Sequence, residues 1–251
     1  MPNHPLDQYR EFLKDTIRQR VDFSQTDQSR GVPPPPLEKP CAAGAIQVKL
    51  AGPDEWKGIG TIDLTVAIKD RQSRRRFAAA PLALDELSFL LWATQGVRVR
   101  LNQASALRTV PSAGARHAFE TYLLVSRVEG LDAGVYRYLP LEHALVLEFL
   151  EPDLPAKLVR ATLGQSFVAQ AVVTFIWTAV PYRMEWRYGM AAHKVIALDA
   201  GHVCQNLYLA CETIGAGTCA IAAYHQQLMD RLVRVDGAEE FVVYLAPVGR
   251  V

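Results

Sequence analysis

The sequence predicts an α+β fold with a central, mostly antiparallel sheet that helices flank. Three runs rich in β-branched and aromatic residues follow one another with turn residues between them, which is typical of antiparallel strands. The helical segments lie outside this group instead of alternating with its strands, so a doubly wound parallel sheet is not expected. One long helix is apolar on more than one side and must be covered on more than one side. We therefore expect it at the centre of the fold or at a dimer interface.

The composition is that of a globular chain with a large core. Of its 251 residues, 50% are hydrophobic and 21% are charged, and the net charge is +1, a balance that is not typical of disordered or membrane proteins. A near-neutral chain has no general attraction to nucleic acid or anionic lipid. A local basic patch is still compatible with this net charge. The N-terminus lacks the pattern of a secretory signal, and no apolar stretch is long enough to span a bilayer. We therefore expect a cytoplasmic protein.

The cysteines and histidines do not follow the spacing of metal ligands. The four cysteines form no C-x-x-C pair, and the six histidines show no H-E-x-x-H spacing. Three of the cysteines lie in apolar context, which favours reduced, buried side chains. We expect no metal site.

The first 59 residues are expected to form an arm that precedes one domain over residues 60–251. Apolar side chains at helical spacing predict an amphipathic helix over residues 7–20. The stretch from Ser24 to Pro40 contains four consecutive prolines, Pro33 to Pro36, and is therefore expected to be extended and polyproline-like. We interpret this stretch as a strap laid over the body or over a partner subunit. A ligand for an SH3-like domain is the alternative.

Within the domain, periodicity and turn residues divide the chain into helices, strands and one long loop. The expected helices are a short one through Leu64, Ile68 and Lys69, then residues 84–95, 155–164, 186–214 and 225–235. The expected strands are residues 119–126, 134–140, 145–150, 171–179 and 240–249. Gly96 ends the second helix, and residues 97–116 are expected to be a loop. The continuous apolar run at 171–179 is typical of a buried central strand.

The densest functional signal is the arginine-rich run at residues 71–77. It reads Arg71-Gln72-Ser73-Arg74-Arg75-Arg76-Phe77 and lies between two predicted helices. A phosphate dianion is bound well by planar, permanently charged donors together with a hydroxyl, and this run supplies both. A solvated basic loop, or a loop that contacts nucleic acid, explains the same composition. On the residues alone these alternatives stay open.

Two further segments are rich in small residues. Residues 111–117 precede a strand, and their small side chains would let the backbone approach a flat aromatic ligand, with Ser112 available for hydrogen bonding. A tight turn explains them equally well. Residues 215–223 follow the longest helix; Gly215 and Gly217 are explained by helix termination, but the whole run leaves little bulk where another surface must come close.

Together these segments and their order resemble the nitroreductase-like FMN-dependent family, and within it the SagB-type dehydrogenase or thiazoline oxidase-like branch. The resemblance covers about residues 60–250. Its motifs are R-x-S-x-R-x-F at 71–77, LSFLLWATQGV at 87–97, RTVPSAGARHAFETYLLV at 108–125, GVYRYLP followed by HALVL, W-x-Y-G at 186–189, and LDAGHVCQNLYLACETIGAGT at 198–218.

The resemblance implies a homodimer with two FMN sites at the subunit interface. It assigns Arg71 and Ser73 to the phosphate or ribityl chain, and Arg75 to the N1 and C2 carbonyl edge of the ring. A cation at that edge stabilises the negative charge of the reduced flavin. The remaining implied cofactor contacts are Pro111, Ser112, Ala113 and Gly114 along the cofactor, a backbone N–H of Ala222 or Ala223 toward N5, and Arg250 as a second phosphate ligand.

The chain departs from the azoline-oxidising relatives at one pair of residues. Many of those relatives have Lys-Tyr where this chain has Arg187-Tyr188, and arginine does not act as a base at neutral pH. Tyr188 remains a candidate acid or substrate contact, and a packing tyrosine is the equal alternative. His193 stays open as a proton carrier. We interpret His202 as a core or interface residue, whereas His225 is placed to cap a helix or to face the flavin.

The function expected from the sequence is FMN-dependent hydride transfer from NAD(P)H to a small organic acceptor of the nitroaromatic, quinone or enone type. No G-x-G-x-x-G follows a strand, so the nicotinamide is expected to visit the flavin transiently instead of occupying its own domain. Within enzymes, the alternative is an azoline-oxidising, peptide-tailoring dehydrogenase. Outside enzymes, it is a nucleic-acid-binding module that uses the basic residues 69–76. A family member that binds flavin without turnover is also compatible.

Overall fold

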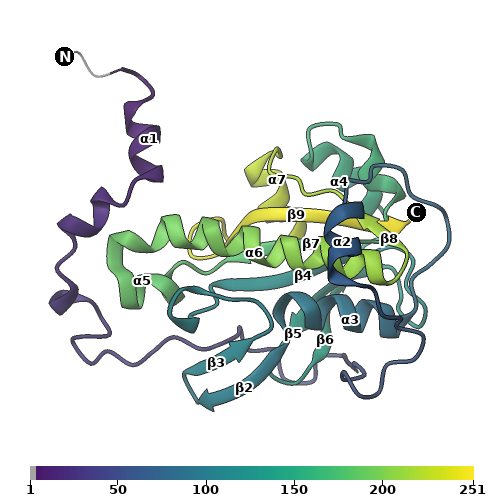
Figure 1. Cartoon of the computed structure of the whole chain (residues 1–251), viewed down its shortest axis with the longest axis horizontal. Helices are drawn as coiled ribbons and strands as arrows, with labels where there is room; N and C mark the ends of the chain where they lie inside the picture. Colours follow the sequence, from purple (N-terminus) through teal and green to yellow (C-terminus); the bar gives the residue numbers. More distant parts are fainter. Residues whose placement is uncertain (1–3) are drawn as a thin grey trace.

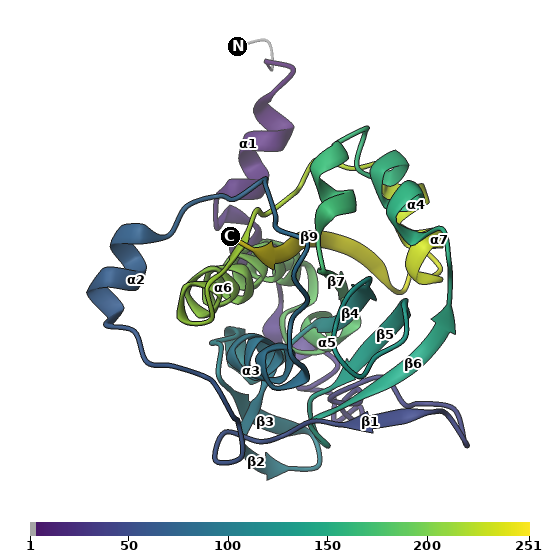
Figure 2. The ribbon, with the colours of Figure 1, turned by 90° about the vertical axis from the view of Figure 1, so that its right-hand side faces the viewer.

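The computed structural model describes residues 4–251 and centres on a seven-stranded antiparallel sheet (Figures 1 and 2). The strand order is β1-β6-β5-β4-β7-β9-β8. The strands are β1 (Gln47–Lys49), β4 (Phe119–Val125), β5 (Gly134–Leu139), β6 (Ala144–Leu150), β7 (Val173–Ala179), β8 (Ala216–Thr218) and β9 (Phe241–Arg250). The expected α+β fold with a mostly antiparallel sheet is confirmed. Strand β1 lies in the segment expected to be an arm, and it extends the sheet by pairing with β6.

Strand β7 is central because it is apolar on both faces. Every residue of its sequence VTFIWTA is buried, and it pairs with β4 on one side and β9 on the other. Ile176 lies opposite Tyr122 and Leu245, so one face of the sheet is aligned across three strands. The prediction of a buried strand here is confirmed.

Helices cover both faces of the sheet (Figure 2). On one face, α3 (Leu84–Gln95) and α6 (Ala192–Thr213) pack on the larger core, which includes Trp177. On the other, α4 (Leu154–Ala161) and α7 (Gln226–Val233) pack on a second cluster that includes Ile176. Successive strand residues therefore serve opposite cores, as a pleated strand requires. In the described residues no helix is long and apolar enough to cross a membrane.

The longest predicted helix is interrupted. The structure has α5 (Tyr182–Tyr188), a 3₁₀ turn over Gly189–Ala191, and then α6. Gly189 adopts a φ of 52° with ψ −135°, a conformation that favours glycine and ends a helix. One helix over 186–214 was therefore wrong at its start, although the apolar seam of α6 lies where it was expected.

Two further predictions are corrected at the surface. Residues 97–108 form a hairpin, β2 (Val97–Asn102) with β3 (Ser105–Arg108), where a loop was expected. The alternation VRVRLN has the period of a strand. The helix expected over 7–20 is split into α1 (Asp7–Leu13) and a 3₁₀ turn over Thr16–Arg20, because Lys14 is extended, and neither part buries a residue.

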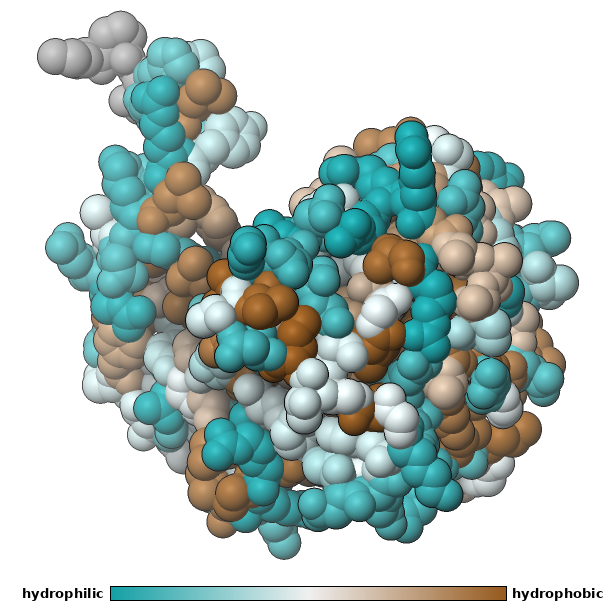
Figure 3. Space-filling view, turned by 45° about the vertical axis from the view of Figure 1, so that its right-hand side comes forward, coloured by the Kyte–Doolittle hydropathy of each residue, from teal (hydrophilic) through white to brown (hydrophobic). Residues whose placement is uncertain are grey.

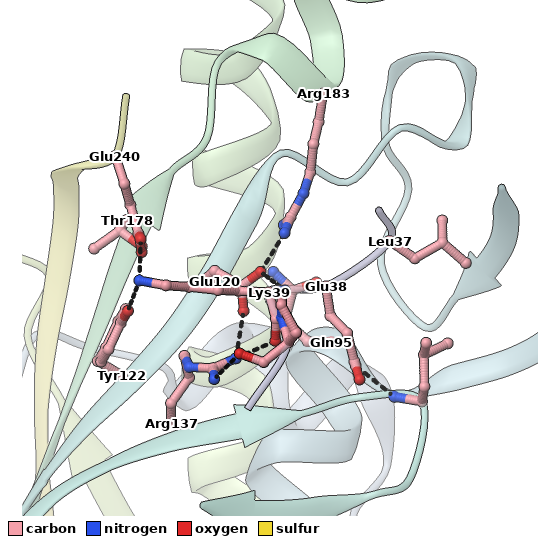
Figure 4. Close-up of polar contacts among 12 residues, drawn as sticks. Leu37, Glu38, Lys39, Gln95, Glu120, Tyr122, Arg137, Thr178, Arg183 and Glu240 are labelled. Atoms are coloured by element: carbon pink, nitrogen blue, oxygen red, sulfur yellow. Dashed lines mark hydrogen bonds and ion pairs between the residues drawn. The ribbon is translucent and has the colours of Figure 1, made fainter. Parts of the chain in front are cut away.

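The strap was expected to be extended from Ser24, which is wrong at its start: Phe23–Gln25 form a 3₁₀ turn and residues 27–31 form further turns closed by backbone hydrogen bonds. The rest of the strap is held on the body by buried charges (Figure 4). Glu120, on β4, accepts from the Lys39 backbone N–H at 2.7 Å. Arg137 donates to the Lys39 and Pro40 carbonyls at 2.7 and 3.2 Å, and Arg108 donates to the Leu37 carbonyl at 3.0 Å. Hydrogen bonds to charged groups are stronger than neutral ones, so this strap is fixed over residues 37–40.

Glu38 is the titratable member of the strap. Its carboxylate accepts from the Leu141 N–H at 3.0 Å. Its pKa is raised from the usual 4.5 to about 7, first by burial and then by the neighbouring Glu142 carboxyl, against the lowering effect of the Leu141 hydrogen bond. The ionised form is therefore disfavoured in the folded protein.

The strap should loosen as pH rises. Because the folded pKa of Glu38 lies above its unfolded value, the folded state binds the proton more tightly, and stability falls between about pH 4.5 and pH 7. We expect limited proteolysis within residues 20–50 to be faster at pH 8 than at pH 5.5, and Glu38→Gln to reduce that difference. Equal pH dependence in the wild type and the variant would contradict it.

Candidate functional site

The arginine-rich run leaves helix α2 (Leu64–Asp70) and lies beside strand β8. Asp63 begins α2 by accepting from the Thr65 and Val66 N–H groups. From Arg71 the chain is extended, and Ser73 forms a parallel bridge with Thr218, with the Arg74 N–H donating to the Thr218 carbonyl at 2.9 Å. The structure thus joins two of the segments that the sequence analysis singled out.

Two glycines allow this close approach. A Cβ at Gly217 would lie 2.4 Å from Cγ of Arg74, and one at Gly249 would lie 2.6 Å from Cγ of Phe77. Any larger residue would displace the arginine-rich run from the sheet. The small residues at 215–223 were expected to lie where another surface comes close. At Gly217 that surface is the arginine-rich run of the same chain.

Tyr208, on α6, organises this part of the site. Its hydroxyl accepts from the Ala220 N–H at 2.8 Å and lies 3.0 Å from the Ser73 hydroxyl. The Arg71 guanidinium carbon lies 5.3 Å from the centroid of the Tyr208 ring, a cation–π arrangement. Tyr208 was not predicted from the sequence, because only the fold brings its partners Ser73 and Ala220 to it.

The outer surface of the run carries the free cations. A hollow of about 380 Å³ is lined by Gln72, Ser73, Arg74, Arg75, Arg76 and Val251. Arg75 and Arg76 are exposed, and neither makes a salt bridge in the described residues. The Nε of Arg74 is buried without a hydrogen-bond partner. Such a donor set fits an anionic group.

The loop after β8 offers free backbone donors. Ile221 is fixed to Leu245 by an N–H to carbonyl bond of 2.8 Å, and the His225 N–H is fixed to the Ala161 carbonyl at 2.8 Å. Between these anchors Ala222 and Ala223 are exposed. Their N–H groups do not donate to any protein atom in residues 4–251.

The segment predicted to line the cofactor, Pro111 to Gly114, leads into a turn that is strained at Ala115 and His117. The Ser112 hydroxyl accepts from the His117 N–H at 2.9 Å. Gly114, Ala115 and His117 have φ values of 58°, 52° and 48°. For non-glycine residues this region is unfavourable, and such strain gathers at functional sites.

Tyr188 lies against this turn. A Cβ at Gly114 would come within 2.5 Å of the Tyr188 hydroxyl and 3.0 Å of the Arg187 Nε. The Arg187 guanidinium carbon is 5.5 Å from the Tyr188 ring centroid. The tyrosine hydroxyl is therefore next to the backbone of the predicted cofactor-lining segment, with a cation beside its ring.

Asp199 supports the same turn by a hydrogen bond from its backbone, a role that was not predicted from the sequence. It lies on α6, is buried, and accepts from the Ala113 N–H at 3.3 Å. Burial raises the pKa of its carboxyl, against the hydrogen bonds from Ser112 and Ala113. His202 lies one turn away, with Nδ1 3.8 Å from the Asp199 carboxylate. The sequence LDAGH alone gave no reason to place this carboxylate under a loop.

The three candidate histidines have different surroundings. His193 contacts the Glu185 carboxylate at 2.8 Å, and its side chain is half exposed. His202 is exposed in the single chain, so it is not a core residue there. His225 occupies the position before α7 without a side-chain capping bond, so the cap is not formed.

Arg250 is held by the body of the protein. Its Nη2 donates to both Glu86 carboxylate oxygens, its Nη1 to the Ile214 carbonyl at 2.6 Å, and its Nε to the Pro81 carbonyl at 3.3 Å. The side chain fastens the last residues of β9 to α3. We therefore leave Arg250 out of the phosphate ligands that we propose below.

Within one chain the predicted site residues form two separate groups. The first is Arg71, Ser73 and Arg75, to which the loop that carries Ala222 and Ala223 is joined through Ala220 and Tyr208. The second is Pro111, Ser112, Ala113 and Gly114 with Tyr188. Tyr208 supports the first and Asp199 the second, nine residues apart on α6, which corresponds to about 13 Å along the helix. In the described residues no hydrogen bond joins the two groups.

Comparisons with known proteins identify similar chains. Residues 68–250 match the family described as Nitroreductase family. A relative from Methanocaldococcus jannaschii, provisionally named nitroreductase MJ1384, is 34% identical over 192 residues, which are 76% of this chain and 93% of that protein. The trifolitoxin-processing protein TfxB of Rhizobium leguminosarum bv. trifolii is 28% identical over 163 residues, which are 62% of this chain and 44% of that protein.

A solved structure has the same fold. The crystal structure of a provisionally named nitroreductase from Ralstonia eutropha JMP134 superposes with a TM-score of 0.67 and 26% identity. The superposition covers 87% of this chain and 98% of that one. The family match at 68–250 includes the arginine-rich run, the strained turn and the loop after β8.

The approach of the arginine-rich run can be tested at Gly217. Gly217→Ala places a methyl group where Arg74 lies, and we expect a loss of about 1–3 kcal/mol in the free energy of unfolding. The matched control is Gly201→Ala on α6, where a Cβ meets no atom within 4 Å; it should stabilise by about 0.5–1 kcal/mol. Denaturant unfolding of both variants checks the difference. Equal effects would refute the packing argument.

Proposed function

We propose that this chain, which belongs to the nitroreductase family of FMN-dependent oxidoreductases, takes hydride from NADH or NADPH and passes it to a small organic acceptor. The acceptor class is a nitroaromatic, a quinone or an enone. The observation that carries the proposal is the arginine-rich run fixed beside a loop with free backbone N–H groups. Bound FMN supplies two-electron hydride chemistry at N5 of its ring.

The residues of the first group fit the cofactor in charge and in donor type. FMN combines a phosphate dianion, which only accepts hydrogen bonds, with a flat ring. Arg71 and Ser73 supply a guanidinium and a hydroxyl to the phosphate or ribityl chain. Arg75, exposed and without an ionic partner in residues 4–251, supplies a cation to the N1 and C2 carbonyl edge. The free N–H of Ala222 or Ala223 is the donor proposed for N5.

We propose that a homodimer completes each site. The strained turn with Pro111, Ser112, Ala113 and Gly114 lies in the second group, so a second chain would bring it to the first. The face shown in Figure 3 exposes apolar side chains. Leu64, Val66 and Ile68 of α2 and Leu198 of α6 are exposed at 42–62%, and burial of such side chains drives association. A hollow of about 450 Å³ between α2, α3 and α6 adds to this surface.

The second candidate function is azoline oxidation during peptide tailoring. It is favoured by the similarity to TfxB, although the match spans less than half of that protein. Arg187 remains charged at neutral pH, so it does not remove a proton. In this candidate Tyr188 is the proton-transferring group. The nucleic-acid-binding alternative is displaced, because the chain belongs to an enzyme family.

The cofactor proposal is tested by the visible spectrum of the purified protein after incubation with FMN. We expect the wild type to bind FMN, and Arg71→Ala combined with Arg75→Ala to weaken binding by roughly tenfold per lost charge-assisted contact. The control is Arg160→Ala combined with Arg231→Ala, exposed arginines on the α4 and α7 face. A wild type that stays colourless after addition of FMN would overturn the proposal.

Tyr188 is tested by removing its hydroxyl. Tyr188→Phe should retain FMN and the folded structure, because the ring still packs beside Arg187. If Tyr188 transfers a proton, turnover with an enone acceptor should fall by roughly a hundredfold. Stopped-flow reduction and reoxidation assays separate the two half-reactions. Unchanged turnover with every acceptor class would leave Tyr188 a packing residue.

A further inference from the structure

A chain of three polar groups at the arginine-rich run fixes the direction of each hydrogen bond. The Ala220 backbone N–H only donates, so the Tyr208 oxygen must accept it, at 2.8 Å. Tyr208 then has one proton of its own to place. In the described residues, the acceptor within reach of that proton is the Ser73 hydroxyl oxygen, 3.0 Å away.

The alternative direction is less favourable. If the Ser73 hydroxyl donated to Tyr208, the tyrosine oxygen would accept two hydrogen bonds and its own O–H would have no partner. Tyr208 is only 9% exposed, and a buried donor without a partner is destabilising. Tyr208 therefore donates to Ser73, and the Ser73 proton is left free.

We propose that Tyr208 is a positioning residue that orients the Ser73 hydroxyl as a hydrogen-bond donor toward the phosphate of FMN. This inference rests on the proposed function, in which Ser73 contacts either the phosphate or the ribityl chain of FMN. Here Ser73 is assigned to the phosphate. A phosphate dianion offers only acceptors, so a hydroxyl contributes there only through its proton. The bridge between Ser73 and Thr218 holds the serine backbone while Tyr208 fixes the proton.

The same tyrosine also places the neighbouring cation. The Arg71 guanidinium stacks on the Tyr208 ring at 5.3 Å. One side chain thus supports both proposed phosphate ligands, the guanidinium by its ring and the hydroxyl by its O–H. Because phenylalanine keeps the ring, the two contributions can be separated.

The test compares FMN with riboflavin, which lacks the phosphate. Dissociation constants of both flavins are measured by fluorescence quenching for the wild type, Tyr208→Phe, Ser73→Ala and the double variant, with thermal unfolding to confirm that each folds. We expect Tyr208→Phe to weaken FMN binding by roughly tenfold and to leave riboflavin binding unchanged. In the Ser73→Ala background the tyrosine substitution should have little further effect on FMN.

Two results would overturn the inference. Equal weakening of FMN and riboflavin would mean that Tyr208 acts through the Ala220 loop, which loses its acceptor in the variant. A full effect of Tyr208→Phe in the Ser73→Ala background would mean that the serine is not involved. If riboflavin binds the wild type too weakly to measure, the four FMN constants decide alone. Failure of the wild type to bind FMN would instead refute the proposed function.

Discussion

The contact on which the site depends is the flat packing of the arginine-rich run against β8 and β9. Gly217 and Gly249 make it possible, because side-chain atoms of Arg74 and Phe77 occupy the places where their Cβ atoms would be. The run is held there through Arg74 and Phe77, while the side chains of Arg75 and Arg76 stay exposed. The backbone bond from Arg74 to Thr218 fixes the main chain between Ser73 and Arg75 beside the end of β8. In the proposed function, this packing is what distinguishes an anion site from a solvated charge run, since composition alone does not.

The second group is supported by buried charges that also hold the strap. Glu120 is buried on β4 and pairs with Arg183 of α5 and with Arg137, while it accepts from the Lys39 N–H of the strap. Removing one partner would leave a buried charge uncompensated, at a cost of about 3–5 kcal/mol. Helix α5, fixed in this way, carries Tyr188 to the strained turn at Gly114. The N-terminal segment and the second group are thus connected through the Glu120 carboxylate. The residues that it joins are far apart in the sequence, so sequence patterns do not reveal the connection.

The sequence predicted those parts of the fold that depend on local patterns. The central strand at Val173–Ala179 was predicted because burial on two faces gives a continuous apolar run. The helix at Leu84–Gln95 was predicted because its leucines have helical spacing and Gly96 ends it. The hairpin at 97–108 was missed although β2 alternates, because the alternation marks no buried face: every residue of β2 after Val97 is exposed. Three contacts were not predictable: the hydrogen bond from Ala220 to Tyr208, that from Ala113 to Asp199, and that from Arg250 to Glu86. Each depends on which distant residue lies opposite, and a single sequence does not encode that as a spacing.

The position of both groups along α6 bears on the assembly. Tyr208 supports the first group and Asp199 the second, about 13 Å apart along the helix axis, so one straight element sets their separation. An isologous dimer with a twofold axis repeats every interface contact twice. In the proposed dimer the first group of each chain would meet the second group of its partner, which yields two equal sites from two incomplete ones. This arrangement also gives a reason for apolar residues on more than one side of α6: the buried Leu207 serves the core of its own chain, and the exposed Leu198 is left for a partner. The site and the association would then depend on the same helix, so that loss of the dimer would remove the cofactor contacts of both chains.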